Sequence, residues 1–349
     1  MNAGTVPGSR LAIGIAGLGS VGMRLGEELR VNRDASIVAV TDIDPGNVES
    51  AAEVFEVPED GQFERYEAML DEADLDAVVI ATPNGLHYEQ AMAALDRDLN
   101  VLLEKPIATD VEDAMDLTER AEQSDNVVML GFQRHLNPSF IEGHQRWRQG
   151  DAEPTFITGE LTHDWRDYFD EMDDWRMNPD LSGGGHLINV GIHVIEAILW
   201  MTGLTPINVD AHVSFHDDAE ILDKESSFRI EFENGTIATI TDTGLATRAR
   251  EHVHLWDDDG ALYIDGREWN ERHGYTIDND GTEHDPYRGG SQGKADAFVE
   301  TVQNGDTPPS TARDALWGLV VTLATYKSGR RDEPVDVFDL YPGLTAFER

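Results

Sequence analysis

The segment Gly17-Leu18-Gly19-Ser20-Val21-Gly22 contains three glycines in the pattern G-x-G-x-x-G, between an apolar run and a stretch with helical spacing. Gly17 permits a tight turn, Gly19 lets the backbone approach a pyrophosphate, and Gly22 lets a helix pack closely on a strand. The helix N-terminus, which includes Ser20 and Val21, attracts negative charge. The pattern predicts a dinucleotide-binding loop, with a Gly-rich turn that binds no ligand as the alternative.

Asp42 stands 20 residues after Gly22, at the end of the apolar run 36–42. A carboxylate at this position can accept hydrogen bonds from both hydroxyls of the adenosine ribose, and it would repel a 2′-phosphate. No arginine follows at once, because the next residues are Ile, Asp and Pro. The expected cofactor is therefore NAD, and Asp42 makes NADP the less favoured one.

Two further polar groups follow apolar runs in the same half of the chain. Ligands of open α/β sheets bind at the carboxyl ends of the strands, so both groups are candidates for contact with the cofactor. Lys105 is also a candidate for chemistry, because the chain has only four lysines, although a surface cation at a strand end is the alternative. The candidates are Thr82, Pro83, Asn84 and His87 after the run 76–81, and Glu104 and Lys105 after the run 99–103.

A third group lies in the apolar segment 182–203. Ser182 is a candidate N-cap for a helix, and the three glycines that follow it allow close backbone approach. Asn189 and His193 are four residues apart and are expected to share a helix face with His186. Polar side chains on an apolar helix need partners or a cleft, so Asn189 and His193 are candidate catalytic residues. A hydrogen-bonded core histidine is the alternative for His193.

The elements that must position these residues alternate between apolar strands and amphipathic helices as far as residue 132. This alternation is typical of a doubly wound parallel sheet with helices on both faces, the Rossmann fold. Strands are expected at 10–16, 36–42, 76–81, 99–103 and 126–132, and helices at 21–31, 46–56, 66–73, 85–97 and 110–124.

After residue 133 the pattern becomes that of an α+β domain. Strand-like alternation over 155–164 and 207–265, with hairpin signals at Asn234-Gly235 and Asp259-Gly260, predicts a large open sheet that is mostly antiparallel. Helices are expected at 138–149, 186–202, 292–304 and 311–328, and a last short strand at 334–338. The predicted division is a flexible N-terminus over 1–9, a Rossmann domain over 10–132 and an α+β domain over 133–349.

The 349 residues include 68 acidic and 26 basic ones, a net charge of −42, and no cysteine. The lack of cysteine excludes disulfide frameworks, thiol catalysis and iron–sulfur clusters, and the charge argues against nucleic-acid and membrane partners. The acidic residues are spread over the whole chain, and the composition resembles that of cytoplasmic proteins of extremely halophilic archaea. No signal peptide and no uninterrupted apolar run of membrane-spanning length is recognisable, so a cytoplasmic protein is expected.

The segments ATPNGLHYEQA (81–91), LLEKPIA (102–108) and SGGGHLINVGIHVIEAI (182–198) resemble the glucose–fructose oxidoreductase / inositol dehydrogenase / MocA family of NAD(P)-dependent oxidoreductases. The resemblance extends from Leu11 to about Val337. It implies hydride transfer between nicotinamide and a secondary alcohol or ketone of a sugar, sugar derivative or cyclic polyol. It also implies that the second domain binds substrate and forms homodimers or homotetramers through its open sheet.

The same resemblance implies that Lys105 orients the reacting hydroxyl and that His193 is the general acid/base. The family usually has aspartate four residues before this histidine, where this chain has Asn189. An amide cannot titrate, so proton transfer would fall on His193 alone, or on His193 with Lys105 or a water. The departure mildly favours a bulky or acidic sugar.

The same family resemblance suggests weaker candidates for contact with the substrate. Arg134 resembles its cleft arginine, Trp175 and Arg176 resemble a loop that closes on cofactor and substrate, and Tyr287 lies in a loop that reaches the active site in many members. A surface ion pair is the alternative for either arginine. No metal site is predicted, because His252 and His254 have no partner at a metal-binding spacing and are interpreted as histidines on one strand face.

Two other functions stay open. Some relatives use NAD transiently to hydrolyse glycosides by oxidation, elimination and re-reduction. A non-catalytic, dinucleotide-binding regulator is the other, although such a protein is expected to have lost Lys105 or His193, and both are present here.

Overall fold

The computed structural model describes residues 10–171, 174–216, 220–268, 271–285 and 291–347, and these form two compact units. The first unit comprises residues up to Ile107 together with Asp116–Gln133 and Gln292–Ala312. The second comprises Ala108–Met115, Arg134–Ser291 and the residues from Arg313 onward. Residues 292–312, which the sequence assigns to the second domain, thus cluster with the first unit.

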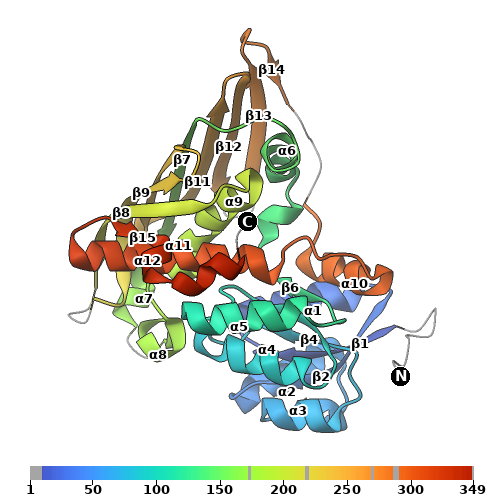
Figure 1. The fold of residues 1–349 in the computed structure, drawn as a ribbon. Coiled ribbons are helices and arrows are strands. Elements are labelled where there is room, and N and C mark those ends of the chain that lie inside the picture. Colours follow the sequence, from blue (N-terminus) through green and yellow to red (C-terminus); the bar gives the residue numbers. More distant parts are fainter. Residues whose placement is uncertain (1–9, 172–173, 217–219, 269–270, 286–290, 348–349) are drawn as a thin grey trace. The chain divides into compact units, whose positions relative to one another are not determined.

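The first unit contains a parallel sheet of six strands in the order β3-β2-β1-β4-β5-β6, which confirms the expected doubly wound fold (Figure 1). Its strands are β1 (Leu11–Ala16), β2 (Ala35–Thr41), β3 (Gln62–Phe63), β4 (Ala77–Ile80), β5 (Asn100–Leu103) and β6 (Val128–Leu130). Its helices are α1 (Ser20–Val31), α2 (Pro45–Phe55), α3 (Tyr66–Glu72), α4 (His87–Leu95) and α10 (Lys294–Asn304), and α5 (Val111–Glu122) has residues in both units.

The carboxyl ends of these strands gather the predicted cofactor residues. Gly17 follows β1, Asp42 follows β2, Thr82 comes shortly after β4, and Glu104 follows β5. Because the strands are parallel, all four positions lie at one edge of the sheet. The strand order reverses between β1 and β4, and this reversal is the point where open α/β sheets bind ligands.

The second unit contains a sheet of nine strands within the described ranges, in the order β14-β13-β12-β11-β7-β10-β9-β8-β15. Every pairing is antiparallel except that of β7 with β10. Both predicted hairpins are present, at Gly235 between β9 and β10 and at Gly260 between β11 and β12. The strands are β7 (Phe156–Asp164), β8 (Pro206–Phe215), β9 (Asp223–Phe232), β10 (Ile237–Thr243), β11 (Leu245–Asp257), β12 (Gly260–Glu268), β13 (Glu271–Asp278), β14 (Glu283–His284) and β15 (Val335–Asp336).

Helices cover one face of this sheet and leave the other open. On β9, Ser226, Phe228 and Ile230 are buried, whereas the residues between them are exposed. The covered face packs against α6 (Pro138–Trp147) and α9 (Ile192–Thr202). The remaining helices of this unit are α7 (Arg166–Asp170), α8 (Pro179–Ser182), α11 (Ala312–Arg331) and α12 (Val337–Leu340).

The segment around the predicted helix 186–202 differs from the expectation. Ser182 is the last residue of α8 instead of an N-cap, and a π-helical turn, Leu187–Gly191, precedes α9. The stretch Pro179–Thr202 is long and apolar enough to cross a membrane, but its most apolar part is completely buried inside the protein, as in the core helix of a globular fold. The two-residue strands β3 and β14 and the eight-residue strand β13 have no counterpart among the predicted elements.

Candidate active site

Two glycines of the loop in the first unit, Gly17 and Gly22, are closely packed, and the third, Gly19, faces open space. Gly17 has a φ of +83°, and a Cβ atom there would lie 2.5 Å from the carbonyl oxygen of Ala81. A Cβ on Gly22 would lie 1.8 Å from the carbonyl oxygen of Gly17. A Cβ on Gly19 would meet no atom within 4 Å, so the loop is open at the point where a pyrophosphate is expected.

Asp42 links the end of β2 to this loop. Its Oδ2 accepts a hydrogen bond from the Leu18 backbone N–H at 2.6 Å. Its Oδ1 accepts from the Asp44 N–H at 2.9 Å and from the Asn47 side chain at 3.3 Å. The carboxylate is therefore held beside the glycine turn, where the sequence places the contact to the ribose.

His87 joins the two loops that follow β4 and β5. Its Nδ1 lies 2.6 Å from the Pro106 carbonyl oxygen and its Nε2 lies 2.9 Å from the Thr82 carbonyl oxygen. Burial lowers the pKa of His87, although both carbonyl contacts oppose that effect. Each ring nitrogen faces a carbonyl oxygen, which can only accept a hydrogen bond, so the ring links the two loops through its two nitrogens. The sequence predicts His87 as a contact to the cofactor. In the structure its side chain is buried, and its ring nitrogens face backbone carbonyl groups.

Glu104 is buried and forms an ion pair with Lys294 at the start of α10. The Lys294 ammonium also donates to the Gly131 carbonyl oxygen at 3.3 Å. Burial alone would raise the pKa of Glu104, but the positive charges of Lys294 and Lys105 outweigh burial and hold that pKa below its usual range. The glutamate before Lys105 is thus ionised and fixed by a lysine 190 residues away in the chain.

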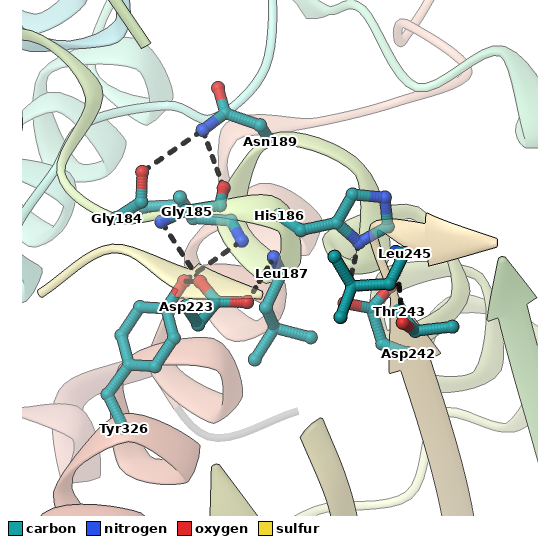
Figure 2. Close-up of polar contacts among 11 residues, drawn as sticks. Gly184, Gly185, His186, Leu187, Asn189, Asp223, Asp242, Thr243, Leu245 and Tyr326 are labelled. Carbon is teal, nitrogen blue, oxygen red and sulfur yellow. Dashed lines mark hydrogen bonds and ion pairs between the residues drawn. The ribbon is translucent and has the colours of Figure 1, made fainter. Parts of the chain in front are cut away.

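In the second unit, Asp223 holds the turn that leads to the π-helical segment (Figure 2). Its two carboxylate oxygens accept hydrogen bonds from the N–H groups of Gly185 at 2.9 Å and Leu187 at 2.8 Å. Tyr326 donates its hydroxyl to Asp223 at 2.5 Å. Burial, and then the negative charge of Asp242, raises the pKa of Asp223 to about 6.

The consecutive glycines of this turn serve internal packing. A Cβ on Gly185 would lie 2.0 Å from the carbonyl oxygen of Asp223, and one on Gly184 would lie 2.6 Å from the Tyr326 hydroxyl. Gly183 has a φ of +73°, which a residue with a side chain rarely adopts. The close approach predicted for these glycines is therefore an approach by the protein's own backbone and side chains.

Asn189, His186 and His193 are all buried. The Asn189 amide donates to the carbonyl oxygens of Gly184 at 3.2 Å and Gly185 at 2.7 Å. The His186 Nδ1 lies 2.8 Å from a carboxylate oxygen of Asp242. Figure 2 shows the Asn189 amide and the His186 ring directed to different partners, so the expected common face is not formed by these two. Asn189 lies inside the π-helical turn Leu187–Gly191, which changes the helical spacing, and His193 follows this turn as the second residue of α9.

Arg134 lies in an internal ion cluster. Its guanidinium donates to both oxygens of Glu251, at 3.1 and 2.5 Å, and Arg272 donates to Glu251 at 2.6 Å. Burial, and then the neighbouring Arg272 charge, lowers the pKa of Arg134 to about 10. Arg134 is 1% exposed, so the structure gives it a place in the core of the unit instead of the predicted place in a cleft.

Arg176 is held in a preformed position. Its guanidinium lies 4.6 Å from the ring centre of Trp175 and 4.7 Å from that of Tyr168, and its Nη1 is 3.0 Å from Asp174. Both Trp175 and Arg176 are only partly buried, so they are available to a ligand. Tyr287, the remaining predicted substrate residue, lies outside the described residues.

One cavity in the second unit has a volume of about 380 Å³ and lies along β7, β8, β9 and β10. The carboxylates of Glu160 and Glu225 and the ring of His212 line it, together with hydroxyl side chains. It contains none of the predicted catalytic residues.

Two family models match the chain, one over the dinucleotide fold and one over the sheet of the second unit. Residues 11–132 match the oxidoreductase family with an NAD-binding Rossmann fold, and residues 152–266 match the GFO/IDH/MocA C-terminal domain. The chain belongs to the GFO/IDH/MocA family. The resemblance seen in the sequence is confirmed, and so is the pairing of a dinucleotide fold with a second, mostly antiparallel sheet.

Individual relatives of this GFO/IDH/MocA protein are distant. D-xylose 1-dehydrogenase (NADP(+)) 2 of Haloferax volcanii is 24% identical over 94% of this chain and 100% of the relative. D-xylose 1-dehydrogenase [NADP(+)] of Haloarcula marismortui is 26% identical over 55% of this chain, and the match spans only about half (52%) of that relative. Apo scyllo-inositol dehydrogenase from Lactobacillus casei has the same fold, with a TM-score of 0.78, 24% identity and coverage of 94% and 98% of the two chains.

Sequence reasoning did not single out Lys294, Asp223, Tyr326 or Asp242, which hold the candidate residues in place. One signal was available for Lys294, because it is one of only four lysines in the chain. The other three come from elements remote in sequence, and nothing in their local patterns distinguishes them from other polar residues.

Proposed function

We propose that the protein is a dehydrogenase or reductase that transfers hydride between NAD and a secondary alcohol or ketone of a sugar, sugar derivative or cyclic polyol. The observation that carries this proposal is the glycine loop with Asp42 fixed beside it, in a chain that has Glu104-Lys105-Pro106 at the carboxyl end of β5. The names of the two curated relatives, both xylose dehydrogenases, support a sugar substrate.

The residues of the first unit fit a dinucleotide. Gly19 and the first turn of α1 would hold the pyrophosphate, Asp42 the adenosine ribose, and the loops at Thr82 and Glu104 the nicotinamide half. The nicotinamide accepts or supplies the hydride when bound. Asp42 favours NAD because its negative charge opposes a 2′-phosphate, whereas the names of both relatives favour NADP. The cofactor assay below decides between them.

Lys105 and His193 are the residues to which we assign the chemistry on the substrate. The Lys105 ammonium would donate to the reacting oxygen and orient the carbon for hydride transfer. His193 would take the hydroxyl proton in oxidation and return it in reduction. Asn189 cannot share that proton, and its donated bonds to Gly184 and Gly185 support a role in shaping the turn.

Composition supports two further parts of the proposal, and the open sheet of the second unit supports a third. A charge of −42 in a folded chain suits concentrated salt, where charge repulsion is screened over about 3 Å at 1 M. We place the protein in the cytoplasm of a salt-adapted cell. The open face of the second sheet is the surface that would join copies into a homodimer or homotetramer.

The test is a screen of sugars, cyclic polyols, sugar acids and nucleotide sugars with NAD and NADP in molar KCl, following NAD(P)H absorbance. We expect turnover with NAD, a fall in kcat of about 10²–10⁴-fold in His193→Asn, and a large loss in Lys105→Met. Lys327→Met, at an exposed lysine, is the matched control and should keep full activity.

Three results would change the proposal. Full activity in Lys105→Met would remove the role given to that lysine. A higher kcat/KM with NADP than with NAD would overturn the role of Asp42. Comparing this cofactor preference in Asp42→Ser and in the control Asp44→Ser would then show whether Asp42 contributes to it. Turnover of glycosides without net NADH formation would favour the NAD-using hydrolase.

A further inference from the structure

Two histidines and one aspartate meet on the open face of the second sheet. His252 and His254 alternate along β11 with Val253 and Leu255, both of which are buried against the helical layer. Asp265 is the direct cross-strand partner of His252 in the register of β11 with β12. The three polar side chains therefore project from the same face of two neighbouring strands.

Their ligand atoms converge on one point. The His252 Nδ1 lies 2.6 Å from Asp265 Oδ1, and the His254 Nε2 lies 2.9 Å from the same oxygen. All three ligand atoms lie within 4.8 Å of one another. In the single chain the side chains are 33%, 23% and 39% exposed for His252, His254 and Asp265, so an ion can reach them while their strands fix their backbones.

Packing restricts the two rings. The His254 ring centre lies 4.9 Å from that of Tyr263 and 6.0 Å from that of Trp256, in edge-on arrangements. The two imidazoles are 5.8 Å apart and nearly perpendicular. A set of donors held in this way loses little conformational freedom when it binds an ion.

We propose that His252, His254 and Asp265 form a binding site for a divalent first-row transition-metal ion, with Zn²⁺ as the representative ion. Two imidazole nitrogens and one carboxylate oxygen are a donor set that zinc accepts, and three protein ligands leave the fourth tetrahedral position for water. On binding, each ring proton that now points to Asp265 moves to the other nitrogen of its ring, so the neutral imidazoles coordinate through the freed nitrogens.

The electrostatics of the cluster favour a cation. Asp265 Oδ1 faces a ring nitrogen of each histidine, so three atoms that can donate an electron pair to a cation surround one point. The chain as a whole carries a charge of −42, which attracts cations to its surface. Two imidazoles among three ligands select zinc, nickel, cobalt or copper over magnesium and calcium, which prefer oxygen.

A matched control exists in the same sheet. His284 lies 2.8 Å from Asp278, and both are exposed, but this pair offers one histidine instead of two. It therefore has the ordinary geometry of a surface histidine–aspartate contact without the third ligand. His284→Gln removes an imidazole that is 52% exposed, more than either proposed ligand, and leaves the proposed site intact.

The experiment titrates the tag-free protein with Zn²⁺ by calorimetry in molar KCl, and with Co²⁺ followed by its visible ligand-field bands. We expect one saturable ion per chain, bands typical of tetrahedral cobalt, and no displacement by excess Mg²⁺. His252→Gln and Asp265→Asn should each weaken Zn²⁺ binding at least about tenfold. Removing a residue that only hydrogen-bonds a metal ligand already lowers metal affinity about 10–100-fold, and the loss of a ligand should be no smaller. His284→Gln should bind like the natural chain.

The selectivity measurement keeps the proposal testable if a variant fails to fold, which circular dichroism would reveal. Absence of saturable binding to the natural chain would show that the cluster is only a histidine–aspartate contact. Equal binding of Mg²⁺, or unchanged affinity in folded His252→Gln and Asp265→Asn, would equally overturn the site.

Discussion

Lys294 is the residue whose removal tests the architecture around Lys105 most directly. Substituting it by methionine keeps most of the side-chain volume and removes the charge that neutralises Glu104. The Lys294 and Glu104 side chains are 7% and 9% exposed, so Glu104 would be left as a buried carboxylate with only the charges of Lys105 and Arg24 to oppose its burial. Breaking a buried ion pair by removing one partner costs about 3–5 kcal/mol, and we expect the free energy of unfolding to fall by that amount.

The contribution of Glu104 to the pH dependence of the free energy of unfolding should change sign as well. In the natural chain the pKa of Glu104 lies below its usual range, so its contribution is present near neutral pH and is lost only on acidification. In Lys294→Met, burial becomes the dominant influence and raises that pKa above the value in the unfolded chain. The folded state then binds the proton more tightly, so stability decreases as the pH rises through the interval between the two values.

The assay is thermal or urea unfolding in molar KCl between pH 5 and 8, together with kcat and KM. Lys327→Met is the control for losing a lysine, and the double variant Glu104→Gln with Lys294→Met removes both charges and should recover part of the loss. A destabilisation below about 1 kcal/mol, with a free energy of unfolding that does not change with pH, would refute the reasoning. A buried carboxylate that has lost its ion-pair partner costs more than that.

Three further predictions concern the second unit and the whole chain. Glu251→Gln should cost about 3–5 kcal/mol, because it removes the buried carboxylate with which both Arg134 and Arg272 form ion pairs. Burial raises the pKa of Glu251, but the two arginines outweigh it and lower that pKa to about 2, so its stabilisation, present above pH 4.5, disappears as the pH falls toward 2. Identical acid unfolding of variant and natural chain would contradict this. Asn189→Asp should change the pH–rate profile of the activity by adding a titrating group, and an unchanged profile would deny it a place in proton transfer. The thermal midpoint should rise from dilute to molar KCl, and a flat dependence would exclude salt adaptation as the meaning of the acidic composition.

The first unit could be predicted closely because its information is local. Each apolar strand and its following helix are visible in consecutive residues, and Gly17, Gly22 and Asp42 act through the turn in which they stand. The strand ends follow from the parallel order, so the positions of Thr82 and Glu104 at the ligand edge needed no distant information.

The second unit was predicted in outline only, because its important contacts join remote segments. Ser182 and the glycines resemble a helix start, but Asp223 and Tyr326 shape the turn, and a π-helical segment intervenes before His193. Asp265 illustrates the same limit. A cross-strand partner has no fixed sequence spacing, so the alternation of His252 and His254 could not disclose a third ligand.

The ion pair between Glu104 and Lys294 has a consequence for synthesis. The two residues are 190 positions apart, and ribosomes add about 5–20 residues per second, so Lys294 is made about 10–40 s after Glu104. During that interval the nascent dinucleotide fold has neither α10 nor the charge that compensates its buried glutamate. The unit that begins first along the chain is therefore completed only after nearly all of the second sheet has left the ribosome.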